Sequence, residues 1–179
     1  MQEFSFTTFP EITTERLTLR QLEFSDKKAI FRLRSSKEIN SLITRETPKN
    51  LNEAEAFIQV CHDEFEKGNR IFWAMELNDS KNVIGTIVFH RISEVVDYAE
   101  IGYELDPSFH KRGYMSEAMD AIIAYGIDTM KIKVIEAFTH QNNIASIALL
   151  EKHQFIFQPE RKDGGFENNR IFRREIKNN

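Results

Sequence analysis

The chain has 179 residues, of which 41% are hydrophobic and 29% charged, and its net charge is −4. We expect a single domain, 1–179, with a buried core, and the weak negative charge does not favour a nucleic-acid-binding protein. No apolar stretch is long enough to cross a membrane, the amino terminus lacks a secretion signal, and Cys61 is the only cysteine. These features exclude an internal disulfide and favour a cytoplasmic protein without a membrane or nucleic-acid partner.

The first half of the chain predicts one strand, two helices and an antiparallel hairpin. Apolar and polar residues alternate over 16–22, as they do in a half-buried strand. One helix follows the cap candidates at 25–26, and a second follows the capping sequence at 50–53 and ends at a glycine. Two further apolar stretches, 70–77 and 83–90, flank a polar turn and should pair as the hairpin.

The second half predicts a change from antiparallel to parallel strand order. A strand ends at Leu105, and a helix begins near Gly113 with apolar residues at helical spacing. The next strand, 133–139, is reached through this helix, so it should lie parallel to the strand before it. The chain then continues with a helix (143–153) and with strands near 155–158 and 170–176. This pattern predicts an α/β protein whose mixed sheet carries helices on both faces.

The turn before the Gly113 helix is the strongest candidate for a binding site. Backbone N–H groups at a helix start have no intrahelical partner, and a glycine lets a bulky anion approach the main chain. Lys111 and Arg112 add positive charge beside it. The turn also falls where antiparallel order gives way to parallel, and ligands of open α/β sheets tend to bind at such points. We therefore expect a phosphate or pyrophosphate there, with a plain strand-to-helix turn as the alternative.

Four blocks of the sequence match one protein family in order and spacing. The first reads His110-Lys-Arg-Gly-Tyr-Met115 and continues as Tyr-x-x-Glu-Ala, which is similar to the acyl-CoA-binding motif Gln/Arg-x-x-Gly-x-Gly/Ala. The segment 143–155 looks like an Asn-x-x-Ser followed by Glu-Lys-x-Gly-Phe, and 14–20 looks like Thr-Glu-Arg-Leu-x-Leu-Arg. The hairpin around 73–87 is the fourth block. Together they resemble the GNAT acetyltransferases of the RimJ/RimL type, which act on ribosomal-protein amino termini.

The resemblance implies a GNAT fold, with a mostly antiparallel mixed sheet and a splayed parallel pair, and acetyl-CoA as co-substrate. It implies that the acetyl-CoA contacts come from Leu105, His110, Lys111, Arg112, Gly113, Tyr114, Met115, Ser116 and Asn143. Of these, Asn143 is implied to hold the pantetheine arm, with a helix-cap role for Asn142 or Asn143 as the alternative. The N–H near Leu105 is implied to polarise the thioester carbonyl if the strand bulges there. No histidine spacing suggests a metal site, so we predict no metal.

Three positions depart from the family pattern. Leu150 stands where many GNAT enzymes carry the tyrosine that protonates the departing thiolate. Met115 replaces a small residue beside the predicted pyrophosphate site, and Gln154 replaces the glycine before Phe155. An acid for the thiolate must therefore come from another residue.

Glu100 and Ser146 are the candidate catalytic base and acid. The context of Glu100 is similar to the base-bearing strand of histone acetyltransferases, and a solvated strand carboxylate is the alternative. Ser146 shares one helical stripe with Asn143 and Leu150, which brings it close to the place of the lost tyrosine. A serine hydrogen-bonded to the preceding turn is the alternative for this position.

We therefore predict an acyltransferase that moves an acetyl group from acetyl-CoA directly to a primary amine. The expected acceptor is the α-amine of a protein or peptide amino terminus. Two alternatives stay open, an acetyltransferase for small-molecule amines such as polyamines, antibiotics or amino acids, and a CoA-binding regulatory module without turnover. A monomer or a homodimer is expected.

Overall fold

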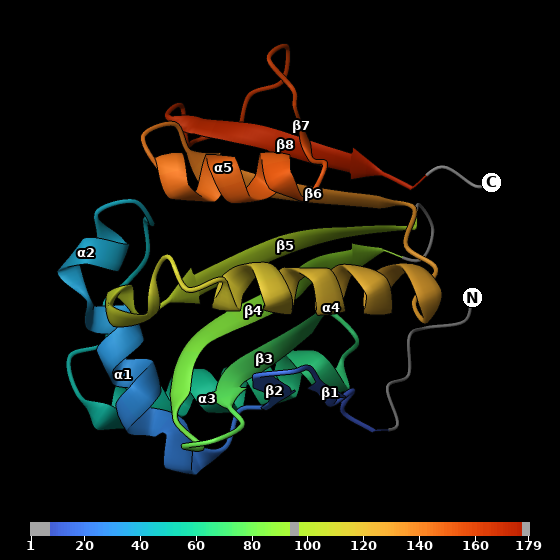
Figure 1. Ribbon diagram of the computed structural model, residues 1–179. Coiled ribbons are helices and arrows are strands. Elements are labelled where there is room, and N and C mark those ends of the chain that lie inside the picture. Colours follow the sequence, from blue (N-terminus) through green and yellow to red (C-terminus); the bar gives the residue numbers. More distant parts are fainter. Residues whose placement is uncertain (1–7, 94–96, 177–179) are drawn as a thin grey trace.

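The computed structural model describes residues 8–93 and 97–176. Its centre is an eight-stranded sheet in the order β1-β2-β3-β4-β5-β6-β8-β7, in which β5 and β6 are parallel (Figure 1). The other neighbouring pairs are antiparallel, which confirms the predicted mixed, mostly antiparallel sheet. The strands are β1 (Ile12–Thr13), β2 (Leu17–Gln21), β3 (Arg70–Leu77), β4 (Val83–Ser93), β5 (Tyr98–Leu105), β6 (Val134–His140), β7 (Ile156–Phe157) and β8 (Asn169–Glu175).

Helices cover both faces of this sheet, as predicted. α4 and α5 lie on one face, and α1 and α3 pack against the other (Figure 1). The predicted cap at Asn50 is present, because its side chain accepts a hydrogen bond from the Glu53 N–H at 3.0 Å. The helices are α1 (Lys27–Ser35), α2 (Lys37–Asn40), α3 (Leu51–Glu66), α4 (Tyr114–Asp128) and α5 (Ile144–Lys152), with short 3₁₀ turns η1 (Phe24–Asp26) and η2 (Pro107–Phe109).

Successive side chains along a strand point to opposite faces of the sheet, so the hydrophobic core is divided between these two faces. Trp73 and Phe89 are fully buried on the side of α4, whereas Phe72 packs on the side of α3. Gly126 allows α4 to lie close to the sheet, because an added Cβ there would meet Phe89 Cε2 at 3.0 Å. Close packing of α4 fixes its first turn beyond the end of β5.

The parallel strands β5 and β6 separate soon after they begin. The last paired residues are Glu100 and Glu136, whereas β5 continues to Leu105 and β6 to His140. The second halves of the two strands therefore diverge. This confirms the predicted splayed parallel pair and leaves an opening between its strands.

Two short elements, β1 and α2, were not predicted. Both are too short to show a hydrophobic period, so only their tertiary contacts define them. β4 also extends past the predicted end, to Ser93. Over the ranges 8–93 and 97–176, no helix combines the length and the apolar character needed to span a membrane.

Candidate active site

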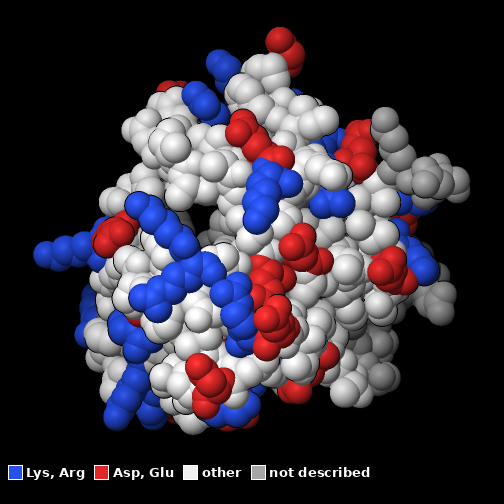
Figure 2. All heavy atoms as spheres, viewed as in Figure 1, with Lys and Arg blue, Asp and Glu red and all other residues white. Residues whose placement is uncertain are grey.

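A cleft of about 270 Å³ occupies the opening between β5 and β6. Glu100 and Tyr103 of β5 line it, together with Asn143 and Ser146 at the start of α5. Figure 2 shows the surface hollowed between α5 and the beginning of α4, with Lys and Arg side chains on the rim. The cleft thus brings together the candidate base, the candidate acid and the asparagine expected to bind the pantetheine arm.

Glu100 lies buried where the two strands part, with 5% of its surface exposed. Its Oε1 accepts hydrogen bonds from Arg91 Nη1 at 2.9 Å and from Tyr98 Oη at 3.1 Å. His90 Nδ1 is 3.6 Å from Oε2, and none of the described residues donates a hydrogen bond to that oxygen. One carboxylate oxygen is therefore held in place while the other can still accept a proton.

His90 and Arg91 belong to this site and were missed by sequence reasoning. Burial, followed by the cations of Arg70 and Arg91, lowers the pKa of His90 to about 4, so its ring is neutral at pH 7. Arg91 has a positive φ of 50° at an irregularity in the β4–β5 pairing. Bulges of this kind redirect side chains, and here the guanidinium reaches Glu100. No glycine marks the bulge, so the sequence carries no signal for it.

A second buried carboxylate, Glu136, faces Glu100 across the parallel pair. Tyr98 Oη lies 3.1 Å from Glu136 Oε2 and at the same distance from Glu100 Oε1. Arg161 and Arg173 also donate hydrogen bonds to Glu136. Burial alone would raise the pKa of the Glu136 carboxyl, but these hydrogen bonds outweigh it and hold that pKa below its usual value. Both oxygens of Glu136 accept hydrogen bonds, so this carboxylate holds the surrounding side chains in place. Glu100 differs, because its Oε2 remains open to accept a proton.

Asn143 and Ser146 form the first turn of α5, on the sheet face opposite to Glu100. Asn143 caps the helix, since its Oδ1 accepts a hydrogen bond from the Ser146 N–H at 3.1 Å. Its amide N–H donors have no acceptor among the described residues, so they remain for a ligand. Ser146 Oγ lies 2.7 Å from Tyr103 Oη rather than against the preceding turn. Leu150 is fully buried, so the place of the lost tyrosine holds an apolar side chain.

Gly113 turns the chain into α4. Its φ of 81° is in the left-handed region that favours glycine, and Lys111 also has a positive φ, of 60°. The first helical hydrogen bond runs from the Glu117 N–H to Gly113 O, so the amides between these residues have no helical acceptor. Lys111 and Arg112 are exposed beside these amides. The Met115 side chain is buried in the core and leaves the turn clear.

Arg16 connects the Gly113 turn to the amino-terminal segment. This contact was not predicted from the sequence. Its guanidinium donates hydrogen bonds to Arg112 O at 2.9 Å and to Glu117 Oε2 at 2.7 Å, and it lies over the Tyr114 ring at 4.4 Å. Glu117 Oε1 accepts further hydrogen bonds from the Arg16 N–H and from Thr14 Oγ1. Burial alone would raise the pKa of Glu117, but these donors outweigh it and hold the pKa below its usual value.

Ser116 connects the same turn to the end of α5. Its Oγ accepts a hydrogen bond from Lys152 Nζ at 2.8 Å and lies 3.0 Å from His153 Nε2. His153 Nδ1 is 3.1 Å from Asp120 Oδ1, and burial is the main reason that the pKa of His153 is lowered. Lys152 thereby adds a further cation to the surroundings of the turn.

β5 keeps a regular register with β4 at Leu105, so the bulge on which the family's contact with the thioester carbonyl depends is not present at this residue. Its register with β4 is continuous up to the Gly85–Leu105 pair. The Asp106 N–H donates to Ile84 O on β4 at 2.8 Å. Because amides alternate in direction along a strand, the Leu105 N–H points the other way, toward the opening. Leu105 O lies on that side too and accepts a hydrogen bond from His110 Nε2 at 3.1 Å.

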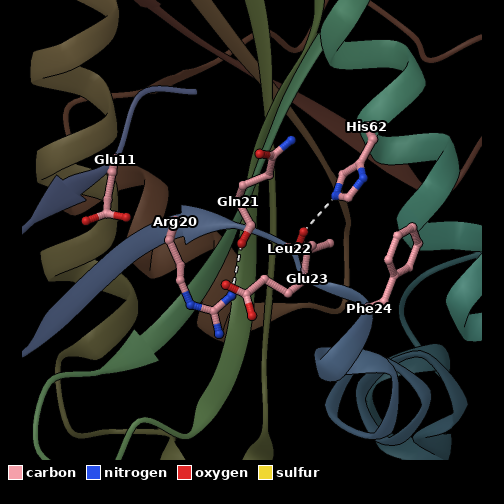
Figure 3. A pocket seen from close by; sticks show the side chains of 7 residues that line it. All are labelled: Glu11, Arg20, Gln21, Leu22, Glu23, Phe24 and His62. Carbon is pink, nitrogen blue, oxygen red and sulfur yellow. Dashed lines mark hydrogen bonds between the residues drawn. The ribbon is translucent and has the colours of Figure 1, made fainter. Parts of the chain in front are cut away.

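A second hollow, of about 320 Å³, shares no lining residue with the cleft (Figure 3). The charged side chain of Arg20 in it is already bound to Asp26 and Glu76. His62 Nε2 donates a hydrogen bond to Leu22 O at 2.7 Å. Arg20 and His62, the groups of this hollow best suited to hold a ligand, are therefore already engaged within the protein, and its greater volume does not make it the better candidate. Its lining consists of Glu11, Arg20, Gln21, Leu22, Glu23, Phe24 and His62.

The fold of this chain has counterparts in known structures. RimL, a ribosomal alpha-N-protein acetyltransferase in complex with coenzyme A, aligns with a TM-score of 0.82 at 20% identity, over 93% of this chain and 98% of that one. MccE, a microcin self-immunity acetyltransferase in complex with acetyl-CoA and AMP, aligns with a TM-score of 0.79 at 17% identity, over 91% and 94%. At these identities the likeness shows a shared fold.

Sequence comparison identifies the family. The uncharacterized N-acetyltransferase YoaA of Bacillus subtilis is 34% identical over 147 residues, which cover 82% of this chain and 83% of YoaA. The family model described as Acetyltransferase (GNAT) domain matches residues 16–156, which include β2 to β6, α4 and α5. The chain therefore belongs to the GNAT family and is an N-acetyltransferase.

Proposed function

We propose that this enzyme takes its acetyl group from acetyl-CoA and transfers it directly to the α-amine of a protein or peptide amino terminus. The observation that carries the proposal is the cleft between β5 and β6, with Glu100 on one side of the sheet and Ser146 on the other. The CoA and acetyl-CoA complexes of RimL and MccE support the donor. RimL, as an alpha-N-protein acetyltransferase, supports the acceptor class. A cytoplasmic location is part of the same proposal.

The Gly113 turn has the properties that a pyrophosphate needs. Its unpaired amides stand at the positive end of the α4 dipole, and a glycine leaves the backbone open to a bulky anion. Lys111 and Arg112 add charge, and Lys152 is held at Ser116. The amide group of Asn143 then offers donors to the pantetheine arm.

The energy of deprotonation favours an α-amine over a lysine side chain as acceptor. At pH 7, removing a proton costs about 1–1.4 kcal/mol for an α-amine with a pKa near 8 and about 4–5 kcal/mol for a lysine with a pKa near 10.4. Glu100 Oε2 is a carboxylate oxygen of the cleft lining that can accept that proton. A carboxylate is a weak base, so it suits the acceptor that is easier to deprotonate.

Each step of the transfer can be assigned to a group of this chain. Glu100 accepts the proton of the attacking amine, directly or through a water molecule. Although β5 has no bulge at Leu105, the Leu105 N–H points toward the opening and stabilises the developing oxyanion of the thioester carbonyl. Ser146 protonates the thiolate as the carbon–sulfur bond breaks. The amine approaches from the side of Glu100, and the thiol departs on the side of α5.

Thermal unfolding with and without acetyl-CoA tests the donor, with ATP and NAD as controls. A ligand at about 100 times its Kd stabilises the native state by roughly 2.7 kcal/mol, so Tm should rise by several degrees with acetyl-CoA alone. No shift at millimolar acetyl-CoA contradicts the role of the Gly113 turn.

Thiol release with a panel of amines tests the acceptor. The panel contains a peptide with a free amino terminus, the same peptide blocked at its amino terminus but carrying a lysine, a polyamine and free amino acids. We expect turnover with the free amino terminus only. Turnover with the polyamine or amino acids instead selects the small-molecule alternative. Acetyl-CoA binding without thiol release for any amine selects the regulatory module.

A further inference from the structure

The hydroxyl groups of Tyr103 and Ser146 meet at the edge of the opening between β5 and β6. Tyr103 Oη and Ser146 Oγ are 2.7 Å apart, they come from β5 and α5, and both residues line the cleft. Because side chains alternate along a strand, Tyr103 points to the face opposite to Glu100, which is the face of α5. The hydroxyl pair therefore lies across the sheet from the candidate base.

The departing thiolate needs a proton, and serine alone supplies it poorly. A serine that gives its proton to a thiolate becomes an alkoxide, which is a much stronger base than the thiolate it has protonated. A second proton delivered to the serine in the same step avoids this alkoxide. Leu150, fully buried where other family members carry a tyrosine, offers none.

Tyr103 is the group in contact with Ser146 that can supply this second proton. Burial raises the pKa of the Tyr103 phenol, and the hydrogen bond with Ser146 only partly offsets that effect. The phenol is therefore protonated throughout the neutral range. Tyr98, the other tyrosine near the cleft, is occupied by the carboxylates of Glu100 and Glu136.

We propose that Tyr103 is the positioning residue of the acid step and passes its proton to the thiolate through Ser146. The inference rests on the proposed function. As the carbon–sulfur bond breaks, the Ser146 proton moves to sulfur and the Tyr103 proton moves to Ser146 Oγ. The phenolate then recovers a proton from water in the cleft, and the proton of the amine has left through Glu100. The net change is one amide and one thiol formed from one amine and one thioester.

The test compares Tyr103→Phe, Ser146→Ala and the double variant, with Tyr125→Phe as a matched control. Tyr125 is a partly buried tyrosine of α4 outside the cleft lining. We expect Tyr103→Phe to lower kcat by about 10²-fold with the KM for acetyl-CoA unchanged, and Tyr125→Phe to keep the wild-type kcat. The double variant should be no slower than Ser146→Ala, because both changes interrupt one relay.

A proton inventory measures how kcat depends on the deuterium fraction in mixtures of light and heavy water. It distinguishes a proton relay from a purely structural role of Tyr103. Wild-type kcat should depend on the deuterium fraction along a curve, since two protons move together, and Tyr103→Phe should show a linear dependence. If Tyr103→Phe does not fold, the wild-type inventory decides alone, and a linear one overturns the relay.

The possible failures are distinguishable. A wild-type enzyme that turns over, with an unchanged kcat in Tyr103→Phe, overturns the relay and leaves the proposed function standing. A wild-type protein that releases no thiol with any amine overturns both. A Tyr103→Phe protein that acetyl-CoA stabilises normally and that turns over slowly supports the relay, because its donor site is then intact.

Discussion

Arg16 and Glu117 are 101 positions apart in the sequence, yet Arg16 Nε and Glu117 Oε2 meet at 2.7 Å beside the first turn of α4. Thr14 and the Arg16 backbone donate to the same carboxylate, and Arg16 also binds Arg112 O. The predicted pyrophosphate turn is therefore held from the amino-terminal side before any ligand arrives. A site fixed in advance loses less conformational entropy on binding, which favours tight association.

Replacing Glu117 with glutamine should destabilise the protein and weaken acetyl-CoA binding. Hydrogen bonds to a charged group contribute about 1.5–3 kcal/mol each when buried, so we expect a loss of this order at pH 7, measured by urea unfolding. The exposed Glu66→Gln on α3 is the control and should change little. An unchanged thermal shift with acetyl-CoA would show that the ion pair does not shape the site.

The same variant should show how Glu117 links stability to pH. Its carboxyl has a lower pKa in the folded protein than in the unfolded chain, where it is near 4.3. The ionised form therefore stabilises the native state above about pH 4.3, and this contribution is lost as the pH falls through the native pKa. The stability difference between wild type and Glu117→Gln should shrink over that acidic range. A constant difference would contradict the assignment.

Gly113→Ala should impair both folding and acetyl-CoA binding. The left-handed backbone costs a residue with a Cβ about 1–2 kcal/mol, and the added Cβ would lie 3.3 Å from Arg16 Nη2. Gly165→Ala is a matched control, because Gly165 has a φ of 86° with no atom near its Cβ position. We expect similar losses of stability in the two variants, measured by chemical unfolding. The stabilisation by acetyl-CoA should fall only in Gly113→Ala, and an equal fall in both would contradict a role for the turn.

The sequence predicted the sheet well because local patterns encode it. The strand 70–77 was predicted with the bounds that the structure has, since apolar residues and a polar turn mark both of its ends. The parallel β5–β6 pair followed from one general rule, that a helical crossover joins parallel strands. The cap at Asn50 and the turn at Gly113 were predicted in the same way, from residues with strong local preferences.

The contacts that complete the site could not be predicted from the sequence. Arg91 reaches Glu100 through a bulge that no glycine marks, and Tyr103 reaches Ser146 through the relative placement of β5 and α5. Arg16 meets Glu117 through a pairing of distant segments. Local propensity contains none of this information, because each contact depends on how separate elements pack.

Glu100→Gln should lower kcat by roughly 10²–10⁴-fold if this carboxylate is the base. The loss should be largest below pH 8, where an α-amine acceptor is mostly protonated and the base matters most. Steady-state rates from pH 6 to 9 measure it. Glu104→Gln is the matched control, because Glu104 lies on the same strand and face but pairs with Arg45 and does not line the cleft. A pH–rate profile that Glu100→Gln leaves unchanged would remove Glu100 from this role.

Cys61, the only cysteine of the chain, should be almost inert in the folded protein. It is 3% exposed on α3, and burial raises the pKa of its thiol to about 12. The thiolate is the reactive form, so at pH 8 we expect a chromogenic disulfide reagent to modify it about 10³-fold more slowly than in guanidinium, where the pKa returns to near 8.5. Fast modification of the native protein would contradict the burial of this side chain. The slow reaction also has a practical consequence, because thiol detected during turnover then comes from released CoA and not from the enzyme.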